Sequence, residues 1–250
     1  MVDISKMTFS FSRLDSFWNC PYGWYLTYIE KPPETQNAFS QYGKFIHYLI
    51  ENWARRVFTI EQLEGEYVRN YHKRVTVPFP KTDFCNMDAI YYNSGLKYVK
   101  EFNGFGEKEI IGAECKMKFE VEGIPCTAII DLITKNMQDK LEIIDHKTYG
   151  SSTTQKEIKH KMQQLYMYAI PIKDNFGEYP DALNFNIFRH KKIPWYRESF
   201  DEKKVKQTKL WIVNTVKAIE KEENFRPVCS NTFFCESICS HRATCKYNKI

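Results

Sequence analysis

The sequence of 250 residues has no apolar run long enough to cross a bilayer. Its beginning, Met1 to Met7, also lacks the apolar core that a signal peptide needs. Neither sign of charge dominates, because 36 basic and 31 acidic side chains leave a formal net charge of +5. These absences predict a soluble, cytoplasmic protein with no membrane partner, whose modest positive charge permits nucleic-acid binding without demonstrating it.

The chain is not poor in apolar residues, and its 43% hydrophobic content is too high for a disordered protein. A chain of this length can bury one core, so we expect residues 1–250 to form a single domain. In a reducing compartment, its eight cysteines would be thiols or metal ligands rather than disulfides.

Two apolar, β-branched runs lie in the middle of the chain. Residues 128–133 and 141–148 are predicted to form adjacent strands, joined by a polar turn at 136–139. Further strands are expected over 110–121 and 180–187. These segments predict an α/β fold.

Acidic residues interrupt the two central strands. Side chains alternate along a strand, so Asp145 and Lys147 point to one face and His146 points to the other. Asp131 on the partner strand can join the first pair. Two carboxylates and an ammonium are costly to bury unless they hold a cation and a reacting phosphate. The pattern therefore indicates a metal-dependent nuclease site.

This arrangement resembles the PD-(D/E)XK nuclease superfamily, with Asp131 as the first acid, Asp145 as the second and Lys147 as the lysine. A second resemblance lies near the N-terminus, where residues 8–30 are expected to form an aromatic-rich helical hairpin with Ser12 as a helix N-cap. The N-terminal motif of RecB-like nucleases is filled there by Ser10, Ser12, Leu14, Cys20 and Pro21.

An amphipathic helix is predicted over 39–58, with its apolar stripe at Tyr42, Ile46, Leu49, Trp53 and Val57. His47 lies beside that stripe, where a lone histidine is usually a packed core residue. The segment from Gly43 to His47 nevertheless resembles the Gly-x-x-x-His helix of RecB-like nucleases, whose histidine binds the catalytic metal. Glu114 lies where this family often has a strand glutamate, but a solvated strand residue is the favoured interpretation.

Gln164 and Tyr168 lie one helical turn apart, downstream of Lys147. They resemble the Gln-x-x-x-Tyr motif of RecB-like enzymes, which implies that they help to position the site; an exposed glutamine and a core tyrosine are the alternative. A last helix is expected over 201–224, and its lysines could be solvated or could contact phosphates.

Three cysteines lie near the C-terminus: Cys235, Cys239 and Cys245. They resemble the iron–sulfur tail of AddB and of CRISPR-associated RecB-like exonucleases. In those proteins the fourth thiolate comes from the Cys-Pro motif, here Cys20, which implies a 4Fe-4S cluster. The first spacing has three residues where the family usually has two. Cys229 could replace Cys20, and zinc could replace the cluster.

Together these resemblances imply a restriction-endonuclease-like core with a central mixed sheet flanked by helices. They further imply a DNA exonuclease in replication, recombination or repair, with room for a helicase or recombination protein as partner. Mg²⁺ or Mn²⁺ would be bound by His47, Asp131, Asp145 and the His146 carbonyl. The alternatives are a structure-specific endonuclease and a catalytically silent DNA-binding scaffold.

The resemblances also divide the single domain into four expected parts. These are an N-terminal helical hairpin with the Cys-Pro motif (1–36), a helical region (37–109), the catalytic core (110–200) and a C-terminal helix with the cysteine tail (201–250).

Overall fold

A mixed five-stranded sheet forms the centre of the protein in the computed structural model, which describes residues 2–228 and 231–248. Its strands follow chain order across the sheet, and every neighbouring pair is antiparallel except β3 and β4, which are parallel. The strands are β1 (Glu109–Val121), β2 (Ile124–Lys135), β3 (Leu141–Gly150), β4 (Ala182–Arg189) and β5 (Trp195–Ser199).

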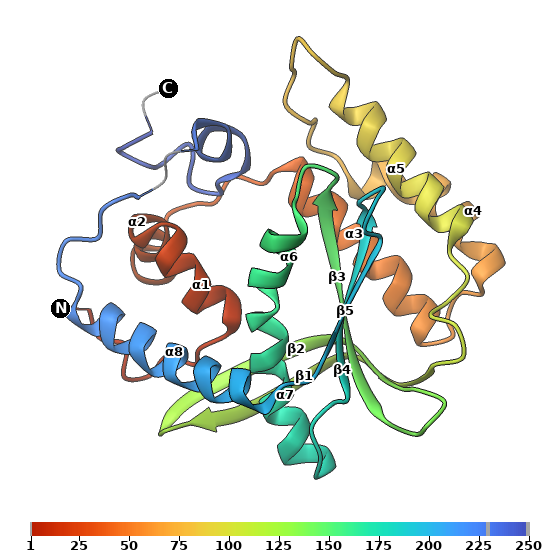
Figure 1. Cartoon of the computed structure of the whole chain (residues 1–250). Coiled ribbons are helices and arrows are strands. Elements are labelled where there is room, and N and C mark those ends of the chain that lie inside the picture. Colours follow the sequence, from red (N-terminus) through yellow and green to blue (C-terminus); the bar gives the residue numbers. More distant parts are fainter. Residues whose placement is uncertain (1, 229–230, 249–250) are drawn as a thin grey trace.

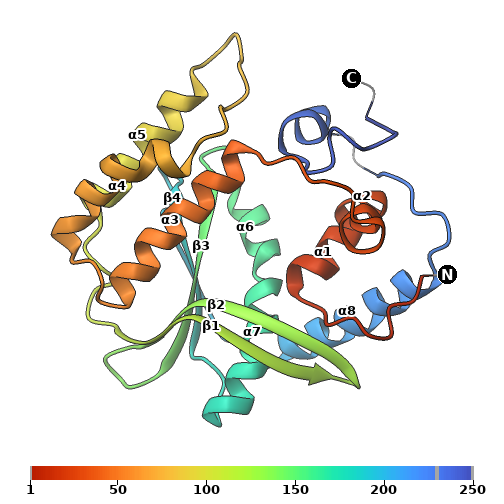
Figure 2. The ribbon, with the colours of Figure 1, turned by 180° about the vertical axis from the view of Figure 1, so that it is seen from behind.

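Helices cover both faces of the sheet (Figure 1 and Figure 2). One face carries α3 (Ala38–Ala54), α4 (Ile60–Arg74) and α5 (Met87–Glu101). On the other side lie α1 (Phe11–Asn19), α2 (Pro21–Tyr25), the π-helical turn η1 (Leu26–Glu30), α6 (Gln155–Lys161), α7 (Gln163–Phe176) and α8 (Glu202–Lys221). A second π-helical turn, η2 (Phe234–Ile238), lies in the C-terminal tail. Among the described residues, none of the helices combines the length and the apolar composition that crossing a bilayer requires.

The centre of the sheet is buried on both faces because its strands carry largely apolar runs, whose successive side chains point to opposite faces. Ile143 of β3 packs into the core shared with α1, α7 and α8, whereas its neighbour Ile144 packs into the core shared with α3, α4 and α5. Leu132 and Ile133 of β2 divide in the same way. The prediction of an α/β fold with a central mixed sheet flanked by helices is therefore confirmed.

The predicted hairpin between the two central strands is also confirmed. Leu132 pairs with Ile144 and Ile133 with Ile143, so Asp131 and Asp145 occupy the next positions of the two strands. The turn is closed by Asn136, whose side-chain oxygen accepts hydrogen bonds from the backbone N–H groups of Gln138 and Lys140. This register brings the two acids to the same level of the sheet.

Two local predictions are wrong. The N-cap of α1 is Ser10 rather than Ser12, because the Ser10 hydroxyl accepts the hydrogen bond from Arg13 N–H at 3.2 Å. The helix predicted over 39–58 ends at Ala54, because Arg56 adopts a left-handed backbone with φ of 60°. Val57, expected on the apolar stripe, lies beyond that end and is 59% exposed.

The C-terminal tail lies beside the segment that follows the N-terminal helical hairpin (Figure 1). The carbonyl of Ser240 accepts a hydrogen bond from Thr35 N–H at 2.7 Å, and that of Ile238 accepts one from the Asn37 side chain at 2.8 Å. Arg242 adds hydrogen bonds to the carbonyls of Thr35 and Gln36. These hydrogen bonds therefore hold the C-terminal tail against residues 35–37.

Candidate active site

Three elements bring metal-binding side chains together on the sheet. His47 comes from α3, Glu114 from β1 and Asp131 from β2, and one donor atom of each lies within 4.8 Å of the other two. The Nδ1 atom of His47 lies 3.5 Å from Asp131 Oδ2 and 3.8 Å from Glu114 Oε1. One nitrogen and two carboxylate oxygens suit Mn²⁺ or Mg²⁺, so this donor set fits a divalent cation.

The orientation of the His47 ring follows from its second nitrogen. Nε2 lies 3.2 Å from the carbonyl oxygen of His146, which can only accept a hydrogen bond. Nε2 therefore carries the hydrogen, and in the neutral ring the lone pair of Nδ1 faces Asp131 and Glu114. The His146 carbonyl, expected to bind the metal, thus holds the ring of His47 and keeps one lone pair for a further contact.

Glu114, for which a solvated strand position was the favoured interpretation, lies in this group of possible metal donors. Its side chain is only 26% exposed, and the β1–β2 register places it opposite Asp131. Its backbone φ is 50°, a left-handed conformation that is rare for a non-glycine residue inside a strand. Backbone strain of this kind costs on the order of 1–3 kcal/mol and is common at functional sites. The sequence carries no signal for it beyond the position of a glutamate on a strand.

Burial and neighbouring charge raise the pKa of Asp131 to about 7, with Asp145 the main charged neighbour that favours the protonated form. Its Oδ2 still accepts a hydrogen bond from the backbone N–H of His146 at 2.7 Å. Burial opposes protonation of His47, but the Asp131 carboxylate and a hydrogen bond to Glu114 outweigh it and raise the His47 pKa. A cation in this position would relieve the repulsion between the carboxylates.

The predicted Asp-x-Lys and Gln-x-x-x-Tyr residues form one hydrogen-bonded group beside these donors. The Lys147 ammonium lies 2.6 Å from Asp145 Oδ2 and donates to Gln164 Oε1 at 2.8 Å. The Gln164 amide nitrogen lies 3.1 Å from Asp145 Oδ1 and 2.6 Å from the Tyr168 hydroxyl. Gln164 therefore links both residues of β3 to α7, and Tyr168 is not an isolated core residue.

The carboxylate of Asp145 can still contact a cation, although the residue is only 2% exposed. Its Oδ2 lies close to the Lys147 ammonium, but the approach is off the direction of a hydrogen bond and the atom accepts none. A carboxylate oxygen that is paired with an ammonium keeps a lone pair for a further contact. Asp145 is not part of the three-donor group around His47, but its Oδ2 is open to a second contact with a cation.

The His146 side chain lies on the opposite face of β3, as the alternation predicts. Its Nδ1 accepts a hydrogen bond from the Asn186 amide at 3.0 Å, and Asn186 also donates to the Tyr98 hydroxyl at 2.7 Å. The ring stacks on Phe105, with 5.8 Å between ring centroids. Burial, together with the positive charges of His47 and Lys147, holds the pKa of His146 well below its usual range, so the ring is neutral.

The cysteines predicted to bind a cluster come from both ends of the chain. Cys20 precedes α2, and its sulfur accepts a hydrogen bond from the backbone N–H of Gly23 at 3.3 Å. Cys235 lies in η2, Cys239 follows it, and Cys245 lies further along the tail. The alternative fourth ligand, Cys229, is outside the described residues.

Zinc and an iron–sulfur cluster make different demands on these thiols. Around one zinc ion, sulfurs at about 2.3 Å from the metal stand roughly 3.8 Å apart. In the described part of the chain, the donor group within 4.8 Å is that of His47, Glu114 and Asp131, so no three of these sulfurs are that close. A cubane holds its thiolates on separate irons and therefore farther apart.

The comparison with protein-family models agrees with this geometry. The family model described as the PD-(D/E)XK nuclease superfamily matches residues 8–246. No curated protein matches the chain significantly. Among solved structures, one described as "Crystal structure of SSO0001" is 18% identical, with 96% of this chain and 94% of that chain covered and a TM-score of 0.38.

Proposed function

The chain belongs to the PD-(D/E)XK nuclease superfamily, and from this premise we propose that it is a metal-dependent DNA exonuclease acting on single strands or DNA ends. Membership implies a restriction-endonuclease-like fold, phosphodiester hydrolysis, a divalent cation and DNA as substrate. The observation that carries the proposal is the convergence of His47, Glu114 and Asp131 beside the linked pair of Asp145 and Lys147.

We assign the metal-binding roles to His47, Glu114, Asp131 and Asp145, with the free lone pair of the His146 carbonyl as a further donor. When bound, Mg²⁺ or Mn²⁺ supplies a water of lowered pKa and neutralises charge on the phosphate. The imidazole nitrogen makes Mn²⁺ the better match of the two, because Mg²⁺ prefers oxygen ligands.

Lys147 is placed to act on the reacting phosphate. Its ammonium is held between Asp145 Oδ2 and Gln164 Oε1 and lies on the same face of β3 as Asp145. An ammonium fixed in this way can orient the attacking water or stabilise the negative charge that develops on the phosphate. Gln164 and Tyr168 position it, since Gln164 contacts both residues of β3.

The test is cleavage of labelled DNA by the full-length protein in Mn²⁺, in Mg²⁺ and in EDTA. Wild type should degrade linear single strands or duplex ends with either metal and should be inactive in EDTA, whereas Lys147→Ala should lose activity about 10²-fold or more. Activity of the Lys147→Ala variant at the wild-type rate would contradict the assignment. Nicking of closed circular DNA would identify an endonuclease, because an exonuclease needs an end.

For the cysteine tail we propose a 4Fe-4S cluster bound by Cys20, Cys235, Cys239 and Cys245. The docking of the tail on the segment after the N-terminal hairpin supports this, because it brings the two sources of thiolate to the same side of the molecule (Figure 1). The cluster would act as a structural clasp that closes a loop of over 200 residues and adds several kcal/mol, roughly as a long-loop disulfide does. Anaerobically purified protein should be brown, and colourless protein containing zinc would contradict the proposal.

A further inference from the structure

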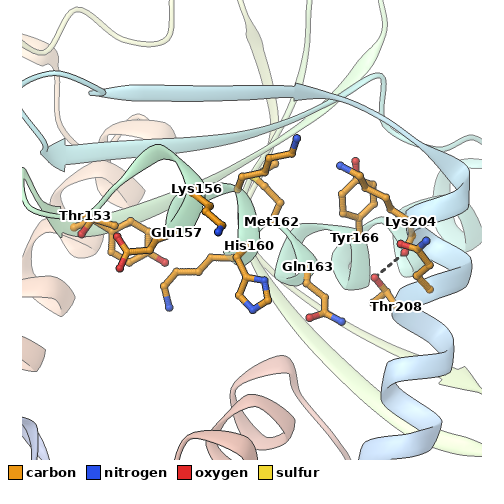
Figure 3. Close-up of a pocket in the computed structure, with 13 residues that line it drawn as sticks. Thr153, Lys156, Glu157, His160, Met162, Gln163, Tyr166, Lys204 and Thr208 are labelled. Carbon is orange, nitrogen blue, oxygen red and sulfur yellow. Dashed lines mark hydrogen bonds between the residues drawn. The ribbon is translucent and has the colours of Figure 1, made fainter. Parts of the chain in front are cut away.

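A groove of about 930 Å³ lies between α6, α7 and α8, on the face of the sheet that carries Lys147. In Figure 3, Lys156 and His160 extend from α6 on one side, and Lys204 and Thr208 lie on α8 on the other. The apolar parts of Met162 and Tyr166 lie between these walls. We call this feature the lysine groove, because Lys156, Lys159, Lys161 and Lys204 all line it.

The charges of the lysine groove are poorly balanced by carboxylates. None of the thirteen ion pairs found in the described part of the chain includes Lys156, Lys159 or Lys161, and all three side chains are exposed. Glu157 lines the groove and interacts electrostatically with Lys161, while its carboxylate accepts hydrogen bonds from the N–H and hydroxyl of Thr154. Lys204 is neutralised by Glu198 at 2.6 Å. One carboxylate therefore faces three ammonium groups of α6, which leaves net positive charge for an anion.

The lysine groove adjoins the active site. Gln163 lines it, and the next residue is Gln164 of the active site. Tyr149 also lines it and follows Lys147 by two residues on β3, a rise of about 7 Å along a strand. Both side chains contact the ring of Phe185, with Lys147 Nζ at 5.3 Å and the Tyr149 ring at 6.3 Å from its centroid.

The groove thus begins next to the candidate phosphate site. The Lys161 ammonium lies 5.7 Å from the centroid of the Tyr149 ring, so Tyr149 joins the lysines of α6 to the strand that carries Lys147, above the buried ring of Phe185. A polymer whose phosphate reacts beside Lys147 can place its next phosphates toward these lysines.

We propose that the lysine groove binds the phosphate backbone of a single-stranded stretch of DNA next to the bond that is cleaved; this rests on the proposed function. Basic walls and an apolar floor suit a single strand, because its phosphates carry charge and its bases have unpaired apolar faces. A duplex turns its bases inward and would contact the groove with phosphates alone.

Binding in EDTA tests the groove without any cleavage. The probe is a fluorescein-labelled single strand, compared with a blunt duplex of the same length, and affinity is measured by anisotropy over a range of salt concentrations. The triple variant Lys156→Gln, Lys159→Gln and Lys161→Gln should bind the single strand roughly 10- to 30-fold more weakly and reduce the salt slope by about 2, since each phosphate contact on a single strand contributes about 0.7.

A matched triple variant controls for net charge. Lys203, Lys217 and Lys221 are also exposed, lie on α8 and do not line the groove. Their replacement by Gln removes the same charge and should change single-strand affinity less than about threefold. The arginine triple variant at 156, 159 and 161 should bind like wild type, because it keeps the charge that contacts phosphate.

Three results would overturn the proposal for the lysine groove. The first is equal single-strand affinity and salt slope in the two glutamine triples, and the second is an equal loss of duplex and single-strand affinity in the groove variant. The third is failure of wild type to bind any DNA in EDTA. Failure of wild type to cleave DNA that it binds would instead contradict the proposed function and leave the groove standing. With Mn²⁺, the groove variant should raise KM by the factor seen in binding and keep kcat within about twofold.

Discussion

Two buried carboxylates lie three residues apart on β3, and they differ in how many partners they have: Asp145 has Lys147 and Gln164, whereas Glu142 has four. Glu142 is 1% exposed, and both of its oxygens accept hydrogen bonds. The donors are Lys108 (2.5 Å) and Asn184 (3.2 Å) to Oε2, and Arg197 (2.6 Å) and Asn136 (3.1 Å) to Oε1. Asp145 is equally buried, yet its Oδ2 accepts no hydrogen bond.

The difference distinguishes a structural acid from one that is prepared for a ligand. Burial opposes ionisation of Glu142, but hydrogen bonds from Lys108, Arg197 and Asn136 outweigh it and lower the pKa. Three residues further along β3, Asp145 faces Asp131 of β2; the two carboxylates repel each other, and the pKa of Asp131 is raised. A carboxylate whose two oxygens are both hydrogen-bonded links elements of the fold. Two carboxylates that repel each other are stabilised when a cation binds between them.

The largest expected effect on activity separates these two acids directly. Asp145→Asn should reduce cleavage about 10³-fold, because the amide has the same shape but no charge for a cation or for Lys147. Glu142→Gln is the matched control and should leave kcat within a few-fold of wild type. Rates measured at saturating DNA and Mn²⁺ check the pair, and a loss of similar size in both variants would remove the distinction.

The same two substitutions should affect the free energy of unfolding in the opposite order, with the larger loss in Glu142→Gln. Glu142→Gln leaves the charges of Lys108 and Arg197 without their partner and should destabilise the protein by about 2 kcal/mol, a value reduced because Arg197 is partly exposed. Asp145→Asn leaves Lys147 without its carboxylate but also removes the repulsion with Asp131, so it should destabilise the metal-free protein less than Glu142→Gln does. Urea unfolding in EDTA measures both free energies of unfolding; greater destabilisation by Asp145→Asn would contradict the comparison.

Asp131 and Glu142 also predict opposite responses of stability to pH. The pKa of Asp131 is raised above its unfolded value, so its stabilising contribution is complete below about pH 4 and is lost as the pH rises through about 7. Burial opposes a raised pKa at His47, but its acidic neighbours prevail, so its contribution is likewise lost as the pH rises. Glu142 has a lowered pKa, so its contribution is present above the unfolded value and lost as the pH falls through the folded one.

Unfolding of the metal-free protein as a function of pH checks these signs. Asp131→Asn should abolish most of the loss of stability near pH 7, and Glu142→Gln should abolish part of the loss in acid. Mn²⁺ should stabilise wild type increasingly as the pH rises, since its ligands must be deprotonated. A Mn²⁺ effect that is independent of pH would contradict the assignment of Asp131 as a ligand.

The smallest expected effect concerns the backbone of Glu114. Both Glu114→Gly and Glu114→Ala remove the carboxylate and should weaken Mn²⁺ binding about tenfold. Glycine tolerates a φ of 50°, whereas alanine keeps the strain, so the glycine variant should be more stable by about 1 kcal/mol. Calorimetric titration with Mn²⁺ and urea unfolding distinguish the two effects, and equal stabilities would show that the strain is negligible.

Sequence patterns predicted the elements that carry the site, because each depends on a local period. The two-residue alternation of β3 places Asp145 and Lys147 on one face, and the helical period places Gln164 over Tyr168. The same period extended α3 too far, since a left-handed residue at Arg56 ends the helix without any proline or glycine to mark it.

Taken by itself, the sequence determined the order of strands and helices and the face on which each acid lies, since these follow from alternating apolar residues along the chain. Only the tertiary structure decided the role of Glu114, the nitrogen that His47 turns toward the acids, the completed bonds of Glu142 and the groove between α6 and α8. Each of these depends on contacts between segments far apart in the chain, and such contacts leave no period in the sequence.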